Sequence, residues 1–300
     1  MNETLDKVED HLCAEAREAL ELPKPERIAF CREDRWVGYT RAQQILRQCD
    51  DLLLHPRSLR MPCLLIVGRS NNGKSSIIEH FIKRHPFLTK EDGTPGFSIS
   101  WVALPAKPSE SNFWSEVLWS LNIAHRTQDR ADVKRPAAID AMRYANTRML
   151  VIDEMNHLAN AGKEAATLLA EIKNATSALR IPILATGTQP AIHALRSEPQ
   201  LMTRFEPIGL ERWKLDAEYL RFLVSYEKLL PLAEQSDLAS RTLAPMIYGM
   251  AGDTIGDTVS LLKEAAVQAI EMGRERIDAE VLSKLRGHRR EDWDEAAKRL

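Results

Sequence analysis

The residues with the clearest chemistry are eight in a row that match the spacing G-x-x-x-x-G-K-[ST]: Gly68, Arg69, Ser70, Asn71, Asn72, Gly73, Lys74 and Ser75. Glycines at these places let the backbone turn, so that its N–H groups point inward at the start of a helix, where the dipole also favours anions. Lys74 can reach the β- and γ-phosphates of a nucleotide, and the Ser75 hydroxyl can ligate Mg²⁺. We include Ser76 among the candidate nucleotide contacts. The alternative is a chance glycine turn, but a buried strand before it and a helix after it favour a phosphate loop.

Two acids end a second apolar segment. Asp153 and Glu154 directly follow the run 149–152. At the carboxyl end of a parallel strand, Asp153 would face the ligand crevice and hold Mg²⁺ directly or through water. Glu154 is placed to polarise the water that attacks the γ-phosphate. Taken alone the pair could cap a helix; together with a phosphate loop it predicts a catalytic site.

The next apolar run, 181–185, leads into Thr186. A polar side chain here would lie beside Asp153 in the sheet and contact the γ-phosphate or the water, although an ordinary strand-to-loop turn explains it equally well. The chain has no Asn-Lys-x-Asp motif, so we expect adenine rather than guanine.

Short apolar strands alternate with helical patterns around these residues, which predicts an α/β core with a parallel sheet flanked by helices. We expect strands at 63–67, 97–104, 149–152, 181–186 and 207–210. After Arg212 only helical spacing remains, over 216–230, 238–250, 254–272 and 278–285, with Asp216 and Asp278 at N-cap positions. The expected division is an N-terminal helical extension (1–60), the α/β core (61–212), a helical module (213–285) and a mobile tail (286–300).

Bulk properties agree with a cytoplasmic globular protein. The net charge is −2, so nucleic-acid binding would need a local basic patch. The four scattered cysteines form no metal or disulfide pattern. The N-terminal 21 residues lack the order of a signal peptide, and no apolar run is long enough to span a membrane.

The phosphate loop, the strand ending in Asp153-Glu154, the strand ending in Thr186 and the Thr203-Arg204-Phe205 segment together resemble AAA+ ATPases, and the helical module resembles their lid. The segment 35–39 and the stretches around 60–75 and 149–158 are similar to TniB/TnsC-type transposition ATPases, relatives of MuB.

The resemblance implies an ATP- and Mg²⁺-dependent regulator that assembles as a ring or helical filament on double-stranded DNA, nucleoid-associated in a bacterial cell. It implies recruitment of a DDE transposase together with a TniQ-type protein. Arg204 matches the arginine that completes a neighbouring subunit's site, with Arg196 as a substitute, and Trp36 and Tyr39 match a segment near the adenine. The lid stretch 252–257 lacks the arginine that many relatives place against the γ-phosphate, so we expect slow hydrolysis.

Backbone binding of a duplex needs exposed cations on one side of the assembly. Lys107, with Ser109 and Ser111, lies in a loop that lines the pore of AAA+ rings. A second basic run precedes the helix before Asp153: Arg126, Arg130, Lys134 and Arg135. Both stretches also fit an ordinary solvated surface.

Two other functions share these motifs. One is an AAA+ helicase loader or replication initiator, which would carry a C-terminal DNA-reading module. The other is a STAND-like switch, which uses ATP to gate protein association without DNA.

Overall fold

The computed structural model describes residues 11–86, 96, 98–162 and 164–289. It divides into two compact units, one formed by residues 41–211 and the other by the residues up to Thr40 together with those from Arg212 on. Each unit has its own hydrophobic core.

The core unit contains a five-stranded sheet in the order β2-β3-β4-β1-β5, in which all neighbouring strands run parallel. Its strands are β1 (Cys63–Gly68), β2 (Ser98–Ala103), β3 (Thr147–Asp153), β4 (Ile183–Gly187) and β5 (Phe205–Leu210). The central strands β1, β3 and β4 are almost continuously apolar because they are covered on both faces. Because these strands run parallel, their last residues, Gly68, Asp153 and Gly187, lie together at the carboxyl ends of the strands.

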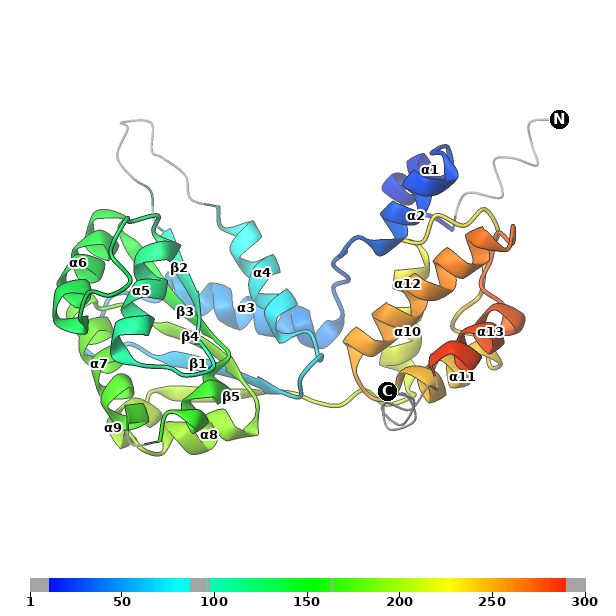
Figure 1. Ribbon diagram of the computed structural model, residues 1–300. Coiled ribbons are helices and arrows are strands. Elements are labelled where there is room, and N and C mark those ends of the chain that lie inside the picture. The colour runs from blue at the N-terminus through cyan, green and yellow to red at the C-terminus, as the bar shows by residue number, and fades with distance from the viewer. Residues whose placement is uncertain (1–10, 87–95, 97, 163, 290–300) are drawn as a thin grey trace, which may run out of the picture. The chain divides into compact units, whose positions relative to one another are not determined.

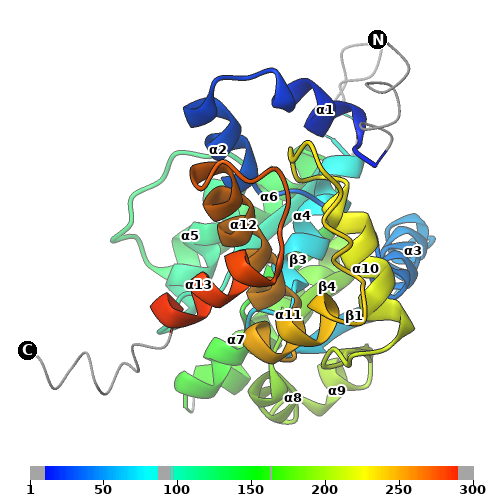
Figure 2. The same ribbon diagram turned by 90° about the vertical axis from the view of Figure 1, so that its right-hand side faces the viewer.

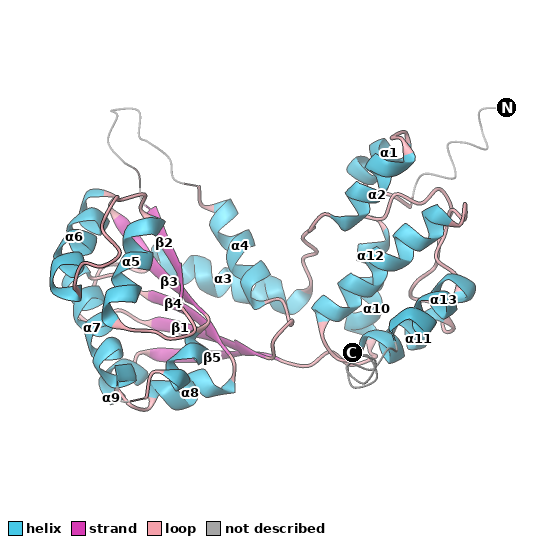
Figure 3. Ribbon diagram, in the orientation of Figure 1, coloured by secondary structure: helices cyan, strands magenta, loops and turns pink. Residues whose placement is uncertain are grey.

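Helices cover both faces of this sheet: Figure 3 shows α5, α6 and α7 on one side and α3 and α4 on the other. The helices of the core unit are α3 (Thr40–Leu54), α4 (Lys74–Arg84), α5 (Glu110–Ser120), α6 (Ala131–Tyr144), α7 (Glu164–Leu179), α8 (Gln189–Leu195) and α9 (Pro199–Met202), with the 3₁₀ helix η1 (Met155–Asn160) after β3. The predicted α/β class with a parallel sheet is confirmed.

The second unit is all-helical. It contains α1 (Ala14–Leu20), α2 (Lys24–Arg32), α10 (Ala217–Glu227), α11 (Leu243–Ala251), α12 (Ile255–Glu271) and α13 (Ala279–Arg289). Asp216 accepts hydrogen bonds from the amides of Glu218 and Tyr219, as expected for the N-cap of α10.

The N-terminal helices do not form a separate extension. Helix α2 lies along α12 (Figures 1 and 2), and Cys31 is buried in the core of the helical unit. Residues 41–60, by contrast, belong to the core unit through α3. The expected boundary at residue 60 therefore differs from the observed one at Thr40, because the two halves of that segment bury their apolar faces against different units.

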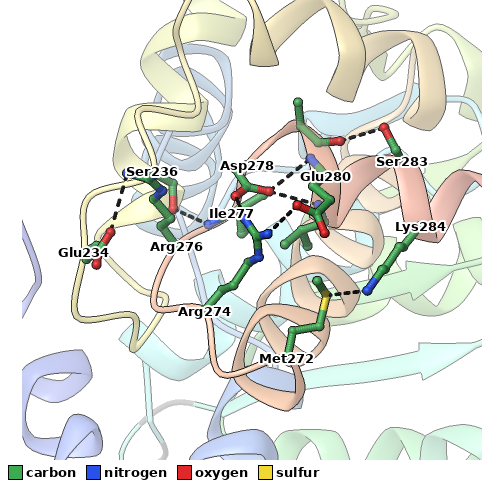
Figure 4. Close-up of polar contacts among 12 residues, drawn as sticks. Glu234, Ser236, Met272, Arg274, Arg276, Ile277, Asp278, Glu280, Ser283 and Lys284 are labelled. Atoms are coloured by element: carbon green, nitrogen blue, oxygen red, sulfur yellow. Dashed lines mark hydrogen bonds and ion pairs between the residues drawn. The ribbon is translucent and has the colours of Figure 1, made fainter.

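The start of α13 is fixed by a polar network around Asp278 (Figure 4). Its Oδ1 accepts from the amides of Glu280 and Val281, both at 3.0 Å, which is the predicted N-cap. Arg274 pairs with both Asp278 and Glu280. Helix α13 continues to Arg289, four residues into the expected mobile tail. Residues 290–300, and the first ten residues of the predicted helical extension, lie outside the described residues.

Candidate nucleotide site

The phosphate loop connects β1 to α4 at the carboxyl edge of the sheet. Gly73 has φ +83° and Asn71 has φ +60°, the left-handed turns that lead the backbone into the first turn of α4. The side chains of Arg69, Ser70 and Asn71 are exposed. Because it leads into the N-terminus of a helix, this loop has the geometry of an anion site.

Lys74 is folded against its own loop. Its Nζ donates to the carbonyls of Gly68 (3.1 Å) and Arg69 (2.8 Å), and the residue is buried. Burial lowers the pKa of the Lys74 ammonium, and the nearby carboxylates of Glu154 and Asp153 partly offset that shift. The nearby carboxylates favour the charged form of this buried ammonium, and its place at the phosphate loop allows it to pair with a phosphate.

Asn72 differs from the three exposed residues before it in the loop. Its side chain is buried, and Nδ2 donates to the carbonyls of Leu210 (3.2 Å) and Glu211 (2.9 Å) at the end of β5. A Cβ on Gly68 would lie 2.9 Å from Cβ of Leu210, so only glycine allows the loop to approach this closely. The side chain of Asn72 thus ties the loop to the end of β5. The predicted contact of Asn72 with a nucleotide stays a prediction.

Asp153 is the centre of the site. Oδ2 accepts from the Ser75 hydroxyl at 2.8 Å, and Oδ1 accepts from the Glu154 amide at 2.8 Å and from the Thr186 hydroxyl. Asp153 and Thr186 are buried, whereas Ser75 is exposed. Thr186 therefore lies beside Asp153 as the sheet order requires, and its hydroxyl orients that carboxylate.

Glu154 turns the chain away from β3. Its φ of +57° is unusual for a side chain this large and marks local backbone strain. Its Oε2 accepts from Asn156 Nδ2 at 2.9 Å, and within the described part of the chain the other carboxylate oxygen accepts no hydrogen bond. Asn156 is not among the residues predicted for the site; a polar residue two positions after the acids is its only signal in the sequence.

The donor set at this edge fits a magnesium nucleotide. A hydroxyl and a carboxylate are hard oxygen ligands of the kind that Mg²⁺ prefers. Among the described residues no three His, Cys, Asp or Glu side chains lie close enough to hold a metal by themselves. Ser75 and Asp153 would therefore need phosphate oxygens to complete the coordination.

Arg204 lies at the amino ends of the strands, whereas the phosphate loop lies at their carboxyl ends. It directly precedes β5, which runs parallel to β1, so it cannot reach its own phosphate loop. It is half-buried; Nη1 donates to Ser177 at 3.0 Å, and Nε is buried without a partner among the residues described. Arg196 is exposed at the end of α8. A role of either arginine in a neighbouring subunit stays a prediction.

Trp36 and Tyr39 belong to the helical unit. The Tyr39 ring packs edge-on against Trp213, with centroids 4.9 Å apart. The predicted adenine contact of these two residues stays a prediction.

The basic candidates divide into exposed and structural side chains. Lys107, Arg126 and Arg130 are exposed. Lys134, which we expected in the basic surface run, is instead buried, and its Nζ donates to Ser111 and to the Thr127 carbonyl. The other members of the two predicted stretches also have internal partners: Ser109 caps α5, Ser111 bonds Asp129, and Arg135 pairs with Glu171. No helix in the described part of the chain is long and apolar enough to cross a membrane.

The sheet order, the phosphate loop and the acids on β3 define a P-loop protein of the AAA+ fold. The chain belongs to the bacterial TniB protein family, whose model matches residues 27–215. No curated protein sequence matches it.

Solved structures share the fold at low identity. The Aeropyrum pernix ORC2 protein (ADPNP–ADP complexes) is 18% identical over 86% of this chain and 71% of that chain, with a TM-score of 0.65. The Aeropyrum pernix ORC1 protein in complex with DNA is 11% identical over 87% and 69%, with a TM-score of 0.61. The Thermotoga maritima RuvB Holliday junction branch migration motor is 17% identical over 89% and 75%, with a TM-score of 0.54.

Proposed function

We propose that this protein is an ATP-hydrolysing regulator of transposition, which assembles on double-stranded DNA and recruits or activates a DDE transposase together with a TniQ-type protein. The observation that carries the ATP-dependent part is the linkage of Ser75, Asp153 and Thr186 beside the buried Lys74. Membership of the TniB family supports the transposition part.

Each residue of the site has a distinct task in this proposal. Loop amides and Lys74 bind and orient the phosphates, while Ser75 and Asp153 hold the cation. Bound Mg²⁺ supplies Lewis-acid neutralisation of the phosphate charge. The free oxygen of Glu154 accepts a proton from the attacking water, and Thr186 keeps Asp153 in place.

Assembly completes the site. Because Arg204 lies at the far edge of its own sheet, it would serve a neighbour, after release from Ser177. A head-to-tail contact of this kind produces closed rings or open helices. The exposed Lys107, Arg126 and Arg130 are the candidate contacts to the DNA backbone, and such contacts carry no base code.

The second candidate is an initiator-like ATPase that prefers particular DNA sequences, which the likeness to the ORC proteins favours. The test is sedimentation of the purified protein with plain duplex DNA, with and without ATP and Mg²⁺. We expect ATP-dependent assembly on any duplex and its loss in Lys74→Ala. Binding confined to one sequence would favour the initiator, and association that needs ATP but no DNA would favour the STAND-like switch.

A further inference from the structure

The amino ends of the parallel strands carry a group of arginines without acidic partners. They lie in four segments at the starts of β1, β3, β4 and β5, namely 54–62, 143–148, 177–182 and 202–205. None of these segments contains an aspartate or a glutamate. The arginines are Arg57, Arg60, Arg148, Arg180 and Arg204.

Hydrogen bonds hold the segment before β1 against the start of β3. Arg57 Nη2 donates to Oδ1 of Asn146 at 3.1 Å. In the opposite direction, Arg148 Nη2 donates to the His55 carbonyl at 3.3 Å. The two segments therefore lie side by side.

The same segment also reaches the starts of β5 and β4. Arg60 Nη2 donates to the Thr203 hydroxyl at 2.6 Å, and Arg204 Nη1 donates to the Ser177 hydroxyl at 3.0 Å. Arg180 follows Ser177 by three residues; its side chain is exposed and has neither an ion pair nor a hydrogen bond within the described residues. All four segments thus belong to one continuous face of the core unit.

This face carries an uncompensated positive charge. Its hydrogen-bonded arginines meet neutral oxygens, whereas arginines elsewhere meet carboxylates, as Arg27 does with Glu275. Burial lowers the pKa of the Arg148 guanidinium, and the charge of Arg57 lowers it further. Even with the exposed Glu206 of β5 counted, five arginines leave an excess of positive charge, so the face attracts an anionic partner.

The same face exposes large apolar side chains. Leu54, Leu59 and Tyr144 are 74%, 79% and 83% exposed, more than any other large apolar residue in the part of the chain that the structure describes. Exposed apolar and aromatic side chains interleaved with arginines are typical of a protein interface. These three residues and the five arginines are called the amino-end surface below.

One segment of the chain matches this surface in both charge and apolar character. Residues 291–295, which lie outside the described residues, contain four acids and Trp293. Carboxylates accept paired hydrogen bonds from guanidinium groups, and an indole ring attracts a guanidinium to its face. Because Arg204 is proposed to serve a neighbouring subunit, the amino-end surface faces another copy, and the segment that reaches it belongs to that copy.

We propose that residues 291–295 of one copy dock on the amino-end surface of the next copy, with Trp293 against Leu59 and Tyr144 and the flanking acids on the arginines. The proposal rests on the proposed function for the head-to-tail order of the copies. A second contact between the same two subunits strengthens their association without any contact to the nucleotide.

Fluorescence anisotropy of a labelled peptide of residues 291–300 measures the docking without nucleotide or DNA. The receptor is the full-length Trp293→Ala variant, so that its own segment competes less. We expect saturable binding that weakens with added salt. A peptide that carries Trp293→Ala should bind at least about tenfold more weakly, as expected for the loss of an aromatic anchor. The control peptide is residues 1–10, which has four acids but no aromatic residue, and we expect it to bind as weakly.

Substitutions in the receptor test the surface. Arg57→Glu/Arg180→Glu should weaken binding at least about tenfold, and Arg180→Glu alone, which removes no side-chain bond, should weaken it about threefold. The matched control is Arg47→Glu, an exposed arginine of α3 outside the surface, with a change within about twofold. Equal binding to the Arg180→Glu and Arg47→Glu receptors overturns the proposal, as does equal binding of the two acidic peptides.

Photocrosslinking in the assembled protein tests which copy supplies the segment. A tagged copy with p-benzoylphenylalanine in place of Trp293 is mixed with untagged copies, a non-hydrolysable ATP analogue, Mg²⁺ and duplex DNA. We expect crosslinks to 54–60 or 143–148 of the untagged copy, and crosslinks only within the tagged copy or only to other segments overturn the proposal. A protein that binds neither ATP nor duplex contradicts the proposed function instead, and the peptide titration, which contains neither, still decides the docking.

Discussion

Replacing Asn72 by alanine tests whether the phosphate loop is tied to the end of β5. The side chain is buried, and its amide is the donor to two consecutive carbonyls, those of Leu210 and Glu211. The preceding carbonyl, of Gly209, accepts two bonds from Arg41. The last residues of the core unit before Arg212 are thus held by side chains from α3 and from the loop.

The expected loss follows from the bonds removed. Each neutral hydrogen bond contributes about 0.5–1.5 kcal/mol to stability, so two contribute about 1–3 kcal/mol. For a domain of roughly 150–250 residues, each kcal/mol shifts the melting temperature by about 2–4 °C. The Asn72→Ala variant should therefore melt about 2–12 °C below wild type. Asn72→Asp should lose more, because its carboxylate would face the same two carbonyl oxygens in a buried place.

Differential scanning calorimetry of the nucleotide-free protein measures the shift. The matched control is Ser70→Ala, in the same loop but exposed, for which we expect a change within about 0.5 kcal/mol. An Asn72→Ala melting temperature that equals that of Ser70→Ala would refute the tie. Retained ATP affinity together with a lowered melting temperature would show that the side chain supports the strand end and does not contact the nucleotide.

Three further predictions concern catalysis and binding. Glu154→Gln should bind ATP, remain assembled on DNA and hydrolyse at least about 100-fold more slowly, and wild-type turnover in that variant would contradict the base role. Arg204→Ala mixed with Lys74→Ala should recover part of the ATPase activity lost in each, because mixed interfaces pair an intact arginine with an intact loop; a mixture no more active than its components would exclude action in trans. Because burial lowers the pKa of Lys74 and bound phosphates raise it again, ATP binding should take up protons in the alkaline range below the ordinary lysine pKa of about 10.4. Calorimetry in buffers of different ionisation enthalpy measures this uptake, which Lys74→Arg should abolish.

The catalytic edge of the sheet could be predicted because its signals are local. A phosphate-loop motif placed between an apolar run and a helical pattern fixes β1 and α4, and the sheet edge then brings Asp153 and Thr186 together. The sequence also placed the helix starts at Asp216 and Asp278, where a side-chain oxygen meets the first free amides.

The missed features depend on contacts between distant residues. Asn72 meets carbonyls 138 and 139 positions away, which no local pattern reveals. Lys134 belongs to a stretch whose charge pattern is typical of a solvated face, yet three oxygen acceptors bury its ammonium. Helix α2 carries few apolar residues, and its place against α12 comes from tertiary packing.

Equilibrium titration of the purified protein with ATP, with and without Mg²⁺, tests the central claim most directly. Wild type should bind ATP more tightly when Mg²⁺ is present, Lys74→Ala should lose the affinity, and Asp153→Ala should lose the dependence on Mg²⁺. A wild-type protein with no affinity for ATP in the presence of Mg²⁺, or a Lys74→Ala variant that binds as wild type does, would contradict the assignment of this loop and these carboxylates as a nucleotide site.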